Sequence, residues 1–367
     1  MTDYSNKYNN LKNKFLVTFI LLSIIISFFI TTNLYAKERE KVIIDAAGRK
    51  VSIPRNIERI VGVGPGALRM IVYLKESEKV VGVEEFEKMQ TKRPYILAHP
   101  ELLELPSIGP QFGGDSELIA ASEPDIIFSS YTSKVQADKL QQKVNKPVVV
   151  ITDGGAGSMN LSDFKTAINI TAAVLNKEKR AEKVINYYNS EIKKLKEKTT
   201  NIKDSKQFSA YIGAIGQKGA HGILSTEGAY PSFQFLNIKN SAADISLKHA
   251  MISAEKLLEW NPEYIFVDEG GYSLAIKDLK ENKFSYLSAI KKEKVYAVLP
   301  YNHYTTNFAT ILVNSYYIGE KVYKDSFGNI NLLKKADEIY NFFVGENVYK
   351  EMTNIFGGYK KVDLEEK

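Results

Sequence analysis

The chain contains no cysteine, and only one tryptophan and four histidines, among its 367 residues. Without cysteine, disulfide bonds, thiolate metal sites and a lipid-bearing cysteine near the N-terminus are all excluded. The histidines form no H-E-x-x-H motif and no i,i+4 pair, and no carboxylate cluster stands at metal-ligand spacing. The sequence therefore predicts no dedicated metal site and no resident cofactor.

Signatures of hydrolytic enzymes are missing as well. No G-x-S-x-G elbow with a Ser-His-Asp order occurs, and no paired carboxylates indicate hydrolysis. We therefore expect a protein that binds without turnover and is not an enzyme. An extracytoplasmic enzyme on the same scaffold is the alternative, and it would need an acid–base pair converging in a cleft. The net charge of +6 is too mild to indicate nucleic acid, although it would tolerate an anionic ligand.

One long apolar run is present, and it lies near the N-terminus. Three lysines precede an almost uninterrupted apolar stretch over residues 15–30, and Thr-Thr-Asn-Leu-Tyr-Ala follows it. This order is typical of a secretory signal peptide, residues 1–36, cleaved after Ala36. Leu34 is large for its distance from the cut, so an uncleaved anchor, giving a membrane-anchored capture protein, is the alternative. We expect a periplasmic protein.

Two copies of one pattern organise the mature chain. Residues 117–125 read ELIAASEPD and residues 255–263 read EKLLEWNPE, each with a Glu seven residues before a Pro that introduces an apolar strand. A helix that ends at x-Pro and leads into a fully apolar strand is one αβ unit of a parallel sheet. The repeat predicts an α/β protein with two similar lobes and mostly parallel sheets.

The first lobe is expected at residues 41–157, with a hairpin over 42–54 and a βαβ unit over 60–83. Residues 86–115 are rich in Pro and Gly, so we expect irregular structure there. Besides the αβ unit at 117–128, the remaining expected elements are a helix at 133–144 and a strand at 148–151.

A segment at residues 158–200 is expected to connect the lobes. Residues 161–198 contain no Pro or Gly and carry apolar residues near helical spacing, which predicts one long helix that can bend near Asn176. Such a rigid helical connector predicts that the two lobes open and close only slightly. The second lobe is expected at 205–302, followed by C-terminal helices at 303–367. Its expected strands are at 208–212, 264–267 and 295–299, and the later helices include 308–323 and 336–343.

A Gly-rich turn follows the first buried strand. Gly62–Ala67 matches G-x-G-x-x-A between a strand and a helix, and Glu84 and Glu85 follow about twenty residues later, as in a dinucleotide-binding fingerprint. Export argues against that reading, because nicotinamide cofactors belong to the cytoplasm. The alternative is a tight turn that presents backbone NH groups and Arg69 to an anionic ligand.

Histidines and aromatic residues fall in the loops after several expected strands. Open α/β sheets bind ligands at that edge, although histidines that are merely solvated in loops are the plain alternative. A tyrosine offers a flat apolar face and one hydroxyl, which suits an organic chelate or a macrocycle better than a bare ion. The residues in question are Phe112, Tyr131, His221, Tyr230, Tyr301, His303 and Tyr304.

Several motifs together resemble the periplasmic iron-siderophore and cobalamin binding proteins of ABC importers. They are the run RIVGVGPGALRMIVYL at 59–74, the strand at 79–83, the repeated pair and the connecting helix. The resemblance covers about residues 42–325. It implies two α/β lobes, joined by a backbone helix, that hold the ligand between them. It also implies that one acidic residue on each lobe docks onto basic residues of the permease, and by motif position these are Glu117 and Glu255.

The resemblance further implies the ligand loops and the cargo. We expect a metal chelate, most directly a ferric siderophore or another iron complex, delivered to a permease with its cytoplasmic ATPase. A corrinoid, haem or a metal oxyanion such as molybdate or tungstate stays open, because no Arg cluster suits an anionic siderophore and Trp260 sits in an expected structural helix. We expect a monomer. The implied ligand-binding residues are Gly64, Pro65, Arg69, Gln111, Phe112, Tyr131, His221, Tyr230, Lys248, His249, Tyr301, His303 and Tyr304.

Overall fold

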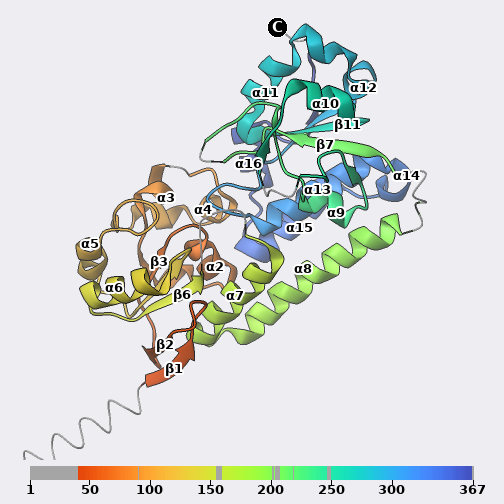
Figure 1. The fold of residues 1–367 in the computed structure, drawn as a ribbon. Coiled ribbons are helices and arrows are strands. Elements are labelled where there is room, and N and C mark those ends of the chain that lie inside the picture. Colours follow the sequence, from red (N-terminus) through yellow and green to blue (C-terminus); the bar gives the residue numbers. More distant parts are fainter. Residues whose placement is uncertain are drawn as a thin grey trace, which may run out of the picture.

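The computed structural model describes residues 40–365, apart from residues 90, 154–158, 201, 203–206, 218 and 246–248. Figure 1 shows two α/β lobes, one in orange to yellow and one in green to blue, with helix α8 (Glu178–Thr199) running along one side of the molecule. The expected signal peptide lies outside the described residues.

The sheet of the first lobe is fully parallel, with the strand order β4-β3-β5-β6. Its strands are almost entirely buried because helices cover both faces, which is why they lack polar alternation. The sequence predicted these elements and the antiparallel hairpin that precedes them. The strands are β1 (Glu40–Ile44), β2 (Lys50–Pro54), β3 (Ile60–Val63), β4 (Val80–Gly82), β5 (Ile126–Ser130) and β6 (Val148–Thr152).

The sheet of the second lobe repeats this topology. Its parallel strands follow the order β9-β7-β11-β12, so in both lobes the first strand in sequence lies between the second and the third. The prediction of two similar lobes is confirmed. The strands are β7 (Ser209–Gly213), β8 (Ser225–Thr226), β9 (Lys239–Asn240), β10 (Ala250–Met251), β11 (Tyr264–Asp268) and β12 (Val295–Val298), of which β8 and β10 form a separate antiparallel pair.

Capping residues mark where several helices around the sheets begin and end. Ser133 caps α6 with its hydroxyl and Gln136 closes the capping box, whereas Asn145 ends that helix in the left-handed conformation. The helices of the first lobe are α2 (Ala67–Tyr73), η1 (Ser77–Lys79), α3 (Glu85–Met89), α4 (Pro94–Ala98), η2 (Pro100–Glu104), α5 (Ser116–Ala121) and α6 (Lys134–Val144). The prediction of irregular structure over residues 86–115 is therefore wrong in part, because proline at the first turn allows the short helices α4 and η2 to start.

The connector is not one helix. It consists of α7 (Leu161–Leu175) and α8, and the break falls at Asn176, whose φ of 56° ends α7 in the left-handed conformation. Asparagine tolerates this backbone because its short polar side chain can bond locally. The expected bend is thus a complete interruption, and α7 packs against both α8 and β6.

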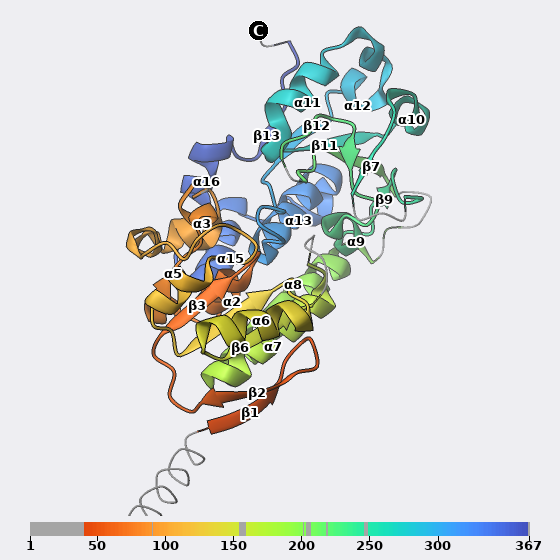
Figure 2. The ribbon, with the colours of Figure 1, turned by 60° about the vertical axis from the view of Figure 1, so that its left-hand side comes forward.

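The C-terminal segment contacts both lobes. Helix α15 (Leu332–Val344) lies between α2 and α13 (Phe308–Val322), as Figures 1 and 2 both show, and Phe343 packs on Tyr73 with ring centres 5.0 Å apart. The chain then returns to the second lobe, where β13 (Lys360–Lys361) pairs antiparallel with β12. The sequence predicted only helix in this tail. The other helices are α9 (Pro231–Phe235), α10 (Ala254–Trp260), η4 (Glu269–Gly271), α11 (Tyr272–Leu279), η5 (Asn282–Tyr286), α12 (Ser288–Lys291), α14 (Lys324–Phe327) and α16 (Tyr349–Phe356).

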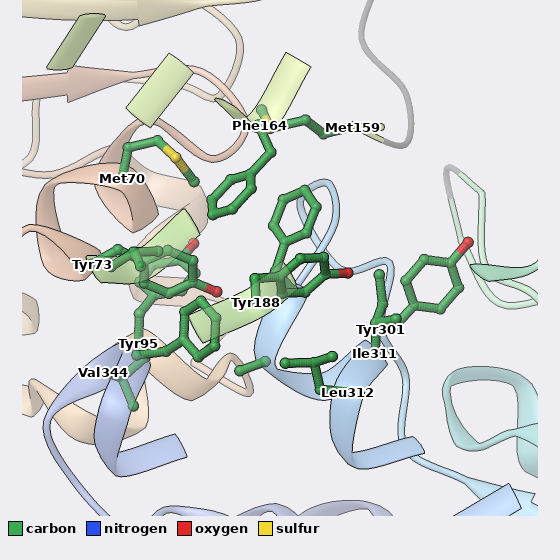
Figure 3. Packing of buried hydrophobic residues seen from close by; sticks show 14 of the residues in the cluster. Met70, Tyr73, Tyr95, Met159, Phe164, Tyr188, Tyr301, Ile311, Leu312 and Val344 are labelled. Atoms are coloured by element: carbon green, nitrogen blue, oxygen red, sulfur yellow. The ribbon is translucent and has the colours of Figure 1, made fainter. Parts of the chain in front are cut away.

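One hydrophobic core runs through both lobes and the helices that join them. Phe164 of α7 stacks on Phe308 of α13 at 4.0 Å, and Tyr188 of α8 contacts both rings. Figure 3 shows Phe164 and Tyr188 in this cluster, beside Tyr73 and Tyr95 of the first lobe. Because this core is continuous, moving one lobe relative to the other would expose apolar surface.

Candidate functional site

The loop between β12 and α13 leaves the second lobe and enters the first. Arg69 of α2 is completely buried, and its guanidinium donates to the carbonyl oxygens of Thr306 at 2.7 Å, Tyr304 at 3.0 Å and His303 at 3.2 Å. These bonds join residues more than 230 positions apart in sequence. Arg69 therefore lies at the seam between the lobes, and its charge is engaged by backbone carbonyls of the opposite lobe.

Tyr304 fills a socket in the first lobe. Its hydroxyl donates to Oε2 of Glu84 at 2.7 Å, and its ring lies 4.4 Å from that of Phe86 and 5.8 Å from that of Phe112. Burial raises the pKa of Glu84 to about 7, although the bond from Tyr304 opposes that rise. The hydroxyl of Tyr304 thus donates to a carboxyl group that is close to half-protonated at neutral pH.

Charged groups behind the socket balance one another. Arg93 is fully buried, forms an ion pair with Glu87, and lies 5.7 Å from the ring centre of Tyr304. Burial, together with the guanidinium groups of Arg93 and Arg69, lowers the pKa of His303 to about 3. His303 is therefore a neutral imidazole at physiological pH, packed edge-on against Phe86.

The turn after β3 and the loop after β5 complete the first-lobe side. Gly64 has φ of 85°, and a Cβ there would lie 2.7 Å from the carbonyl oxygen of Ser130, so only glycine fits this close approach. Tyr131 follows directly and bonds to Thr305 of the opposite lobe, with 2.9 Å between the hydroxyl oxygens. Pro65 is buried in the same turn, where its carbonyl accepts a bond from Ser130.

The second-lobe side carries two histidines and a buried tyrosine pair. The rings of His221 and His249 lie 5.5 Å apart, and both side chains are half-buried. Tyr301 is buried, donates to Glu227, and packs against Tyr230, which is also buried. Burial raises the pKa of the neighbouring Asp268 to about 7. Tyr230 thus lies behind Tyr301 instead of facing solvent.

Contacts across the seam involve five of the predicted ligand-binding residues, Arg69, Phe112, Tyr131, His303 and Tyr304. Gln111 and Phe112 are exposed at its rim, and Phe112 has 58% of its surface free. Lys248 lies outside the described residues. Sequence reasoning missed Phe86, Arg93 and Thr305, which carry no motif. Glu84 was noticed only as the acidic residue of the nucleotide fingerprint.

The periplasmic binding protein family matches residues 60–301 of the chain. The chain belongs to this family. The molybdate-binding protein MolA of Haemophilus influenzae is 24% identical over 344 residues, which cover 87% of this chain and 95% of the relative. The iron-uptake system-binding protein of Bacillus subtilis is 29% identical over 197 residues, which cover 49% and 56%. The structure of MolA bound to molybdate matches with a TM-score of 0.67 and 23% identity, covering 83% of this chain and 98% of that one.

Family membership makes the chain a solute-binding protein of an ABC transporter with a helical backbone between its lobes. Its relatives are periplasmic proteins or lipoproteins. Among the residues that the structure describes, no helix is both long and apolar enough to span a bilayer. The partners that follow are a small-molecule ligand and a membrane permease with its ATPase.

The dinucleotide alternative does not fit this binding protein. The carboxyl of Glu84, which a nucleotide ribose would require, is buried and bonded to Tyr304. A Cβ on Gly66 would meet Thr305 of the opposite lobe at 2.8 Å, so the turn is covered by protein where a pyrophosphate would approach. A tight strand-to-helix turn that lies beneath another loop gives the same G-x-G-x-x-A pattern.

Glu117 and Glu255 occupy equivalent positions in the two lobes. Each is exposed and is the second residue of its helix, α5 or α10, after a capping residue whose side chain accepts amide bonds, Asp115 or Ser253. The backbone amide and the capping Ser253 lower the pKa of Glu255. Both acids are therefore presented to solvent at matching helix starts.

Proposed function

We propose that this protein binds an iron chelate between its lobes and delivers it to the permease of an ABC importer. The observation that carries the proposal is a concentration of backbone strain at the seam. Phe112, Tyr131, Tyr304 and Thr305 all have left-handed backbone, with φ of 66°, 52°, 53° and 62°. For non-glycine residues this conformation costs about 1–2 kcal/mol each and is typical of ligand sites.

The strained residues supply the surfaces that an organic chelate needs. Phe112 presents an exposed ring and Tyr131 a half-buried ring with a hydroxyl. The buried cations near them, Arg69 and Arg93, are engaged by carbonyls and by Glu87. These side chains thus favour stacking and neutral hydrogen bonds, as a chelate with flat aromatic or amide groups requires.

A metal oxyanion is the second candidate, and one observation favours it. The molybdate-binding relative is 24% identical over 344 residues, which cover 95% of its own length. Molybdate or tungstate would then be the cargo.

Metal analysis of the protein from its native source separates the two candidates. Tag-free protein should be isolated from the extracytoplasmic fraction and measured by native mass spectrometry and by plasma mass spectrometry for iron, nickel, molybdenum and tungsten. We expect one iron per protein, together with an organic molecule of several hundred daltons. Molybdenum or tungsten without an organic mass would refute the iron proposal and support the oxyanion. N-terminal sequencing of the same sample tests the expected cleavage after Ala36.

We further propose that Glu117 and Glu255 are the contacts with the permease. Their exposure and their equivalent helix positions support this role. Surface ion pairs contribute about 0–1 kcal/mol each, but two pairs at separated points orient a docking protein and speed its encounter.

A further inference from the structure

The N-terminal hairpin carries apolar side chains on its outer face. Side chains alternate between the two faces along a strand, and an outer face that meets water normally carries polar residues. Strand β2 follows this rule, because its exposed side chains are those of Lys50 and Ser52. Strand β1 breaks it, because Val42 and Ile44 point outward and are 64% and 66% exposed. The outer face of β1 therefore presents apolar surface that the described part of the fold leaves uncovered.

The hairpin lies at the end of the first lobe that is farthest from the second lobe, as Figures 1 and 2 both show. Among the described strands β1 pairs only with β2. In that pairing Val42 lies opposite Ser52, and Ile44 lies opposite Lys50. The outer face thus combines two apolar side chains with one basic and one hydroxyl side chain.

The hairpin is fixed to the first lobe by side-chain bonds. Nζ of Lys41 donates to the carbonyl oxygen of Ala173 in α7 at 2.7 Å. On the other strand, Nη1 of the buried Arg49 donates to the carbonyl oxygen of Val148 in β6 at 3.1 Å. A partner that binds the outer face would therefore orient the whole first lobe.

The chain leads from this face to the apolar run. The run ends at Ile30 and β1 begins at Glu40, so nine residues separate them. Nine extended residues span at most about 32 Å, which is close to the thickness of the hydrocarbon core of a bilayer. While the run is inserted in a membrane, either as a signal peptide before cleavage or as an anchor, the hairpin stays within this distance of the lipid.

The charges near the hairpin favour an anionic lipid surface as the partner. Lys50 lies on the outer face itself, and the exposed Arg55 follows β2 directly. Apolar side chains flanked by basic ones are the pattern by which amphipathic segments bind anionic bilayers. The exposed acids Glu117 and Glu255, by contrast, would be repelled by such a surface. A second copy of the chain is the weaker candidate, because a symmetric contact between two hairpins would bring their basic residues together.

We propose that the outer face of the β1–β2 hairpin is a membrane-contact surface. Val42 and Ile44 enter the headgroup region of an anionic phospholipid bilayer while residues 15–30 are inserted in it, and Lys50 and Arg55 pair with lipid phosphates. The contact limits the tumbling of the tethered first lobe and keeps the binding protein at the membrane that holds its permease. This inference does not depend on the identity of the cargo.

Spin labelling of the full chain tests the contact. Because the chain has no cysteine, Val42→Cys introduces a single labelling site. Met251→Cys is the matched control, since Met251 lies in strand β10 of the second lobe and is 59% exposed. Cell-free synthesis into nanodiscs of phosphatidylethanolamine and phosphatidylglycerol, without signal peptidase, keeps the full chain. Electron paramagnetic resonance then measures collisions of the label with oxygen, which concentrates in lipid, and with a water-soluble nickel chelate.

The two reagents distinguish lipid from water and from protein. We expect the label at position 42 to collide readily with oxygen and to be protected from the nickel chelate at least about threefold more than the label at position 251. Equal accessibility at the two positions would overturn the proposal. Protection from both reagents, with dipolar broadening between labels at position 42, would show a second copy on this face and would also overturn it.

Substitutions of the apolar pair provide the second arm, with the label at Ser52→Cys on the same face. Val42→Ser with Ile44→Ser should remove the protection of this label from the nickel chelate. The matched control is Val135→Ser with Met251→Ser, which removes two apolar side chains that are 61% and 59% exposed elsewhere and should leave the protection intact. Protection that survives the loss of Val42 and Ile44 would refute the contact. Circular dichroism and melting temperature confirm that each variant folds.

Lys50→Glu tests the electrostatic part of the contact. The label at Ser52→Cys should lose protection in nanodiscs that contain phosphatidylglycerol, because the new carboxylate is repelled by the anionic headgroups. In nanodiscs of phosphatidylcholine alone the same substitution should change the protection much less. An equal effect in both lipids would contradict the assignment of an anionic surface as the partner.

Discussion

The phenol of Tyr304, carried by a loop of the second lobe, donates to the carboxyl of Glu84 in the first lobe over 2.7 Å. Both side chains are buried, and the amide of Phe112 donates to the same phenol at 3.4 Å. Because the bond crosses the seam beside the expected ligand, it couples the arrangement of the lobes to the protonation of one carboxyl.

Replacing Tyr304 by Phe should destabilise the protein by about 1–3 kcal/mol, because the buried carboxyl of Glu84 loses its hydroxyl donor. Urea unfolding at neutral pH measures this change. Tyr286→Phe is the matched control, since Tyr286 is 68% exposed. Equal midpoints for the two variants would show that the interlobe bond contributes nothing net.

Stability should fall as pH rises from about 4.5 to about 7. Burial raises the pKa of Glu84 from 4.5 to about 7, so the folded protein holds a proton that the unfolded chain releases. The contribution is complete below the unfolded pKa and is lost as pH passes the folded one, with a magnitude of about 3 kcal/mol. Asp268, raised to about 7, acts in the same direction.

Glu84→Gln isolates the first of these groups. Its amide oxygen still accepts from Tyr304 but does not titrate, so the difference in urea midpoint between pH 5 and pH 7.5 should shrink relative to wild type. Glu117→Gln, at an exposed acid, should leave that difference unchanged. A variant with the full wild-type pH dependence would assign the effect to other carboxyls.

Arg69→Ala should lower the stability of the ligand-free protein by about 2–3 kcal/mol, because three carbonyls of the loop at residues 303–306 lose a charged donor. Arg55→Ala, at an exposed arginine, is the control. A weakened ligand affinity is expected as well, through the released loop. If affinity falls while the ligand-free melting temperature is unchanged, Arg69 contacts the ligand directly.

Arg69 also illustrates what the sequence can and cannot predict. The turn that places it was predictable, because a strand, three glycines and an apolar helix follow one another locally. Its hydrogen-bond partners were not predictable, because every residue type has a backbone carbonyl and these carbonyls lie 234 to 237 residues away in sequence. The same holds for the socket around Tyr304, whose members Phe86 and Arg93 come from a stretch that the Pro and Gly content made look irregular.

The repeated αβ units were the most reliable signal. Each ends in a left-handed residue just before its proline, Glu123 or Asn261, and a buried strand follows. Those are local rules. The parallel strands have the same order in the two sheets, and the C-terminal tail returns to the second sheet as β13. Both features depend on pairing between residues far apart in sequence, which hydrophobic periodicity does not predict.

Lobe closure on binding should be small. A continuous core that includes Phe164, Tyr188 and Phe308 joins the lobes. The chain connects the lobes through α7–α8 and again through the C-terminal segment. Both features oppose hinge motion. Small-angle scattering curves of protein with its native cargo and after cargo removal should nearly superimpose. A clear contraction on loading would place a hinge at Asn176, where the connector is interrupted.

Reversing the charges of Glu117 and Glu255 together, with lysine at both, should abolish transport while ligand affinity and melting temperature stay close to wild type. Both side chains are exposed, so their loss leaves no buried group unpaired, and the permease would meet two repulsive contacts in place of two attractive ones. The control is Glu104→Lys with Glu259→Lys, which changes the net charge equally at exposed sites, one of them on the same helix α10. Uptake of the radiolabelled native cargo by cells that carry each variant measures the effect. If transport survives the reversal, the two glutamates act only at the starts of their helices. If ligand affinity falls together with transport, they belong to the ligand-binding pocket.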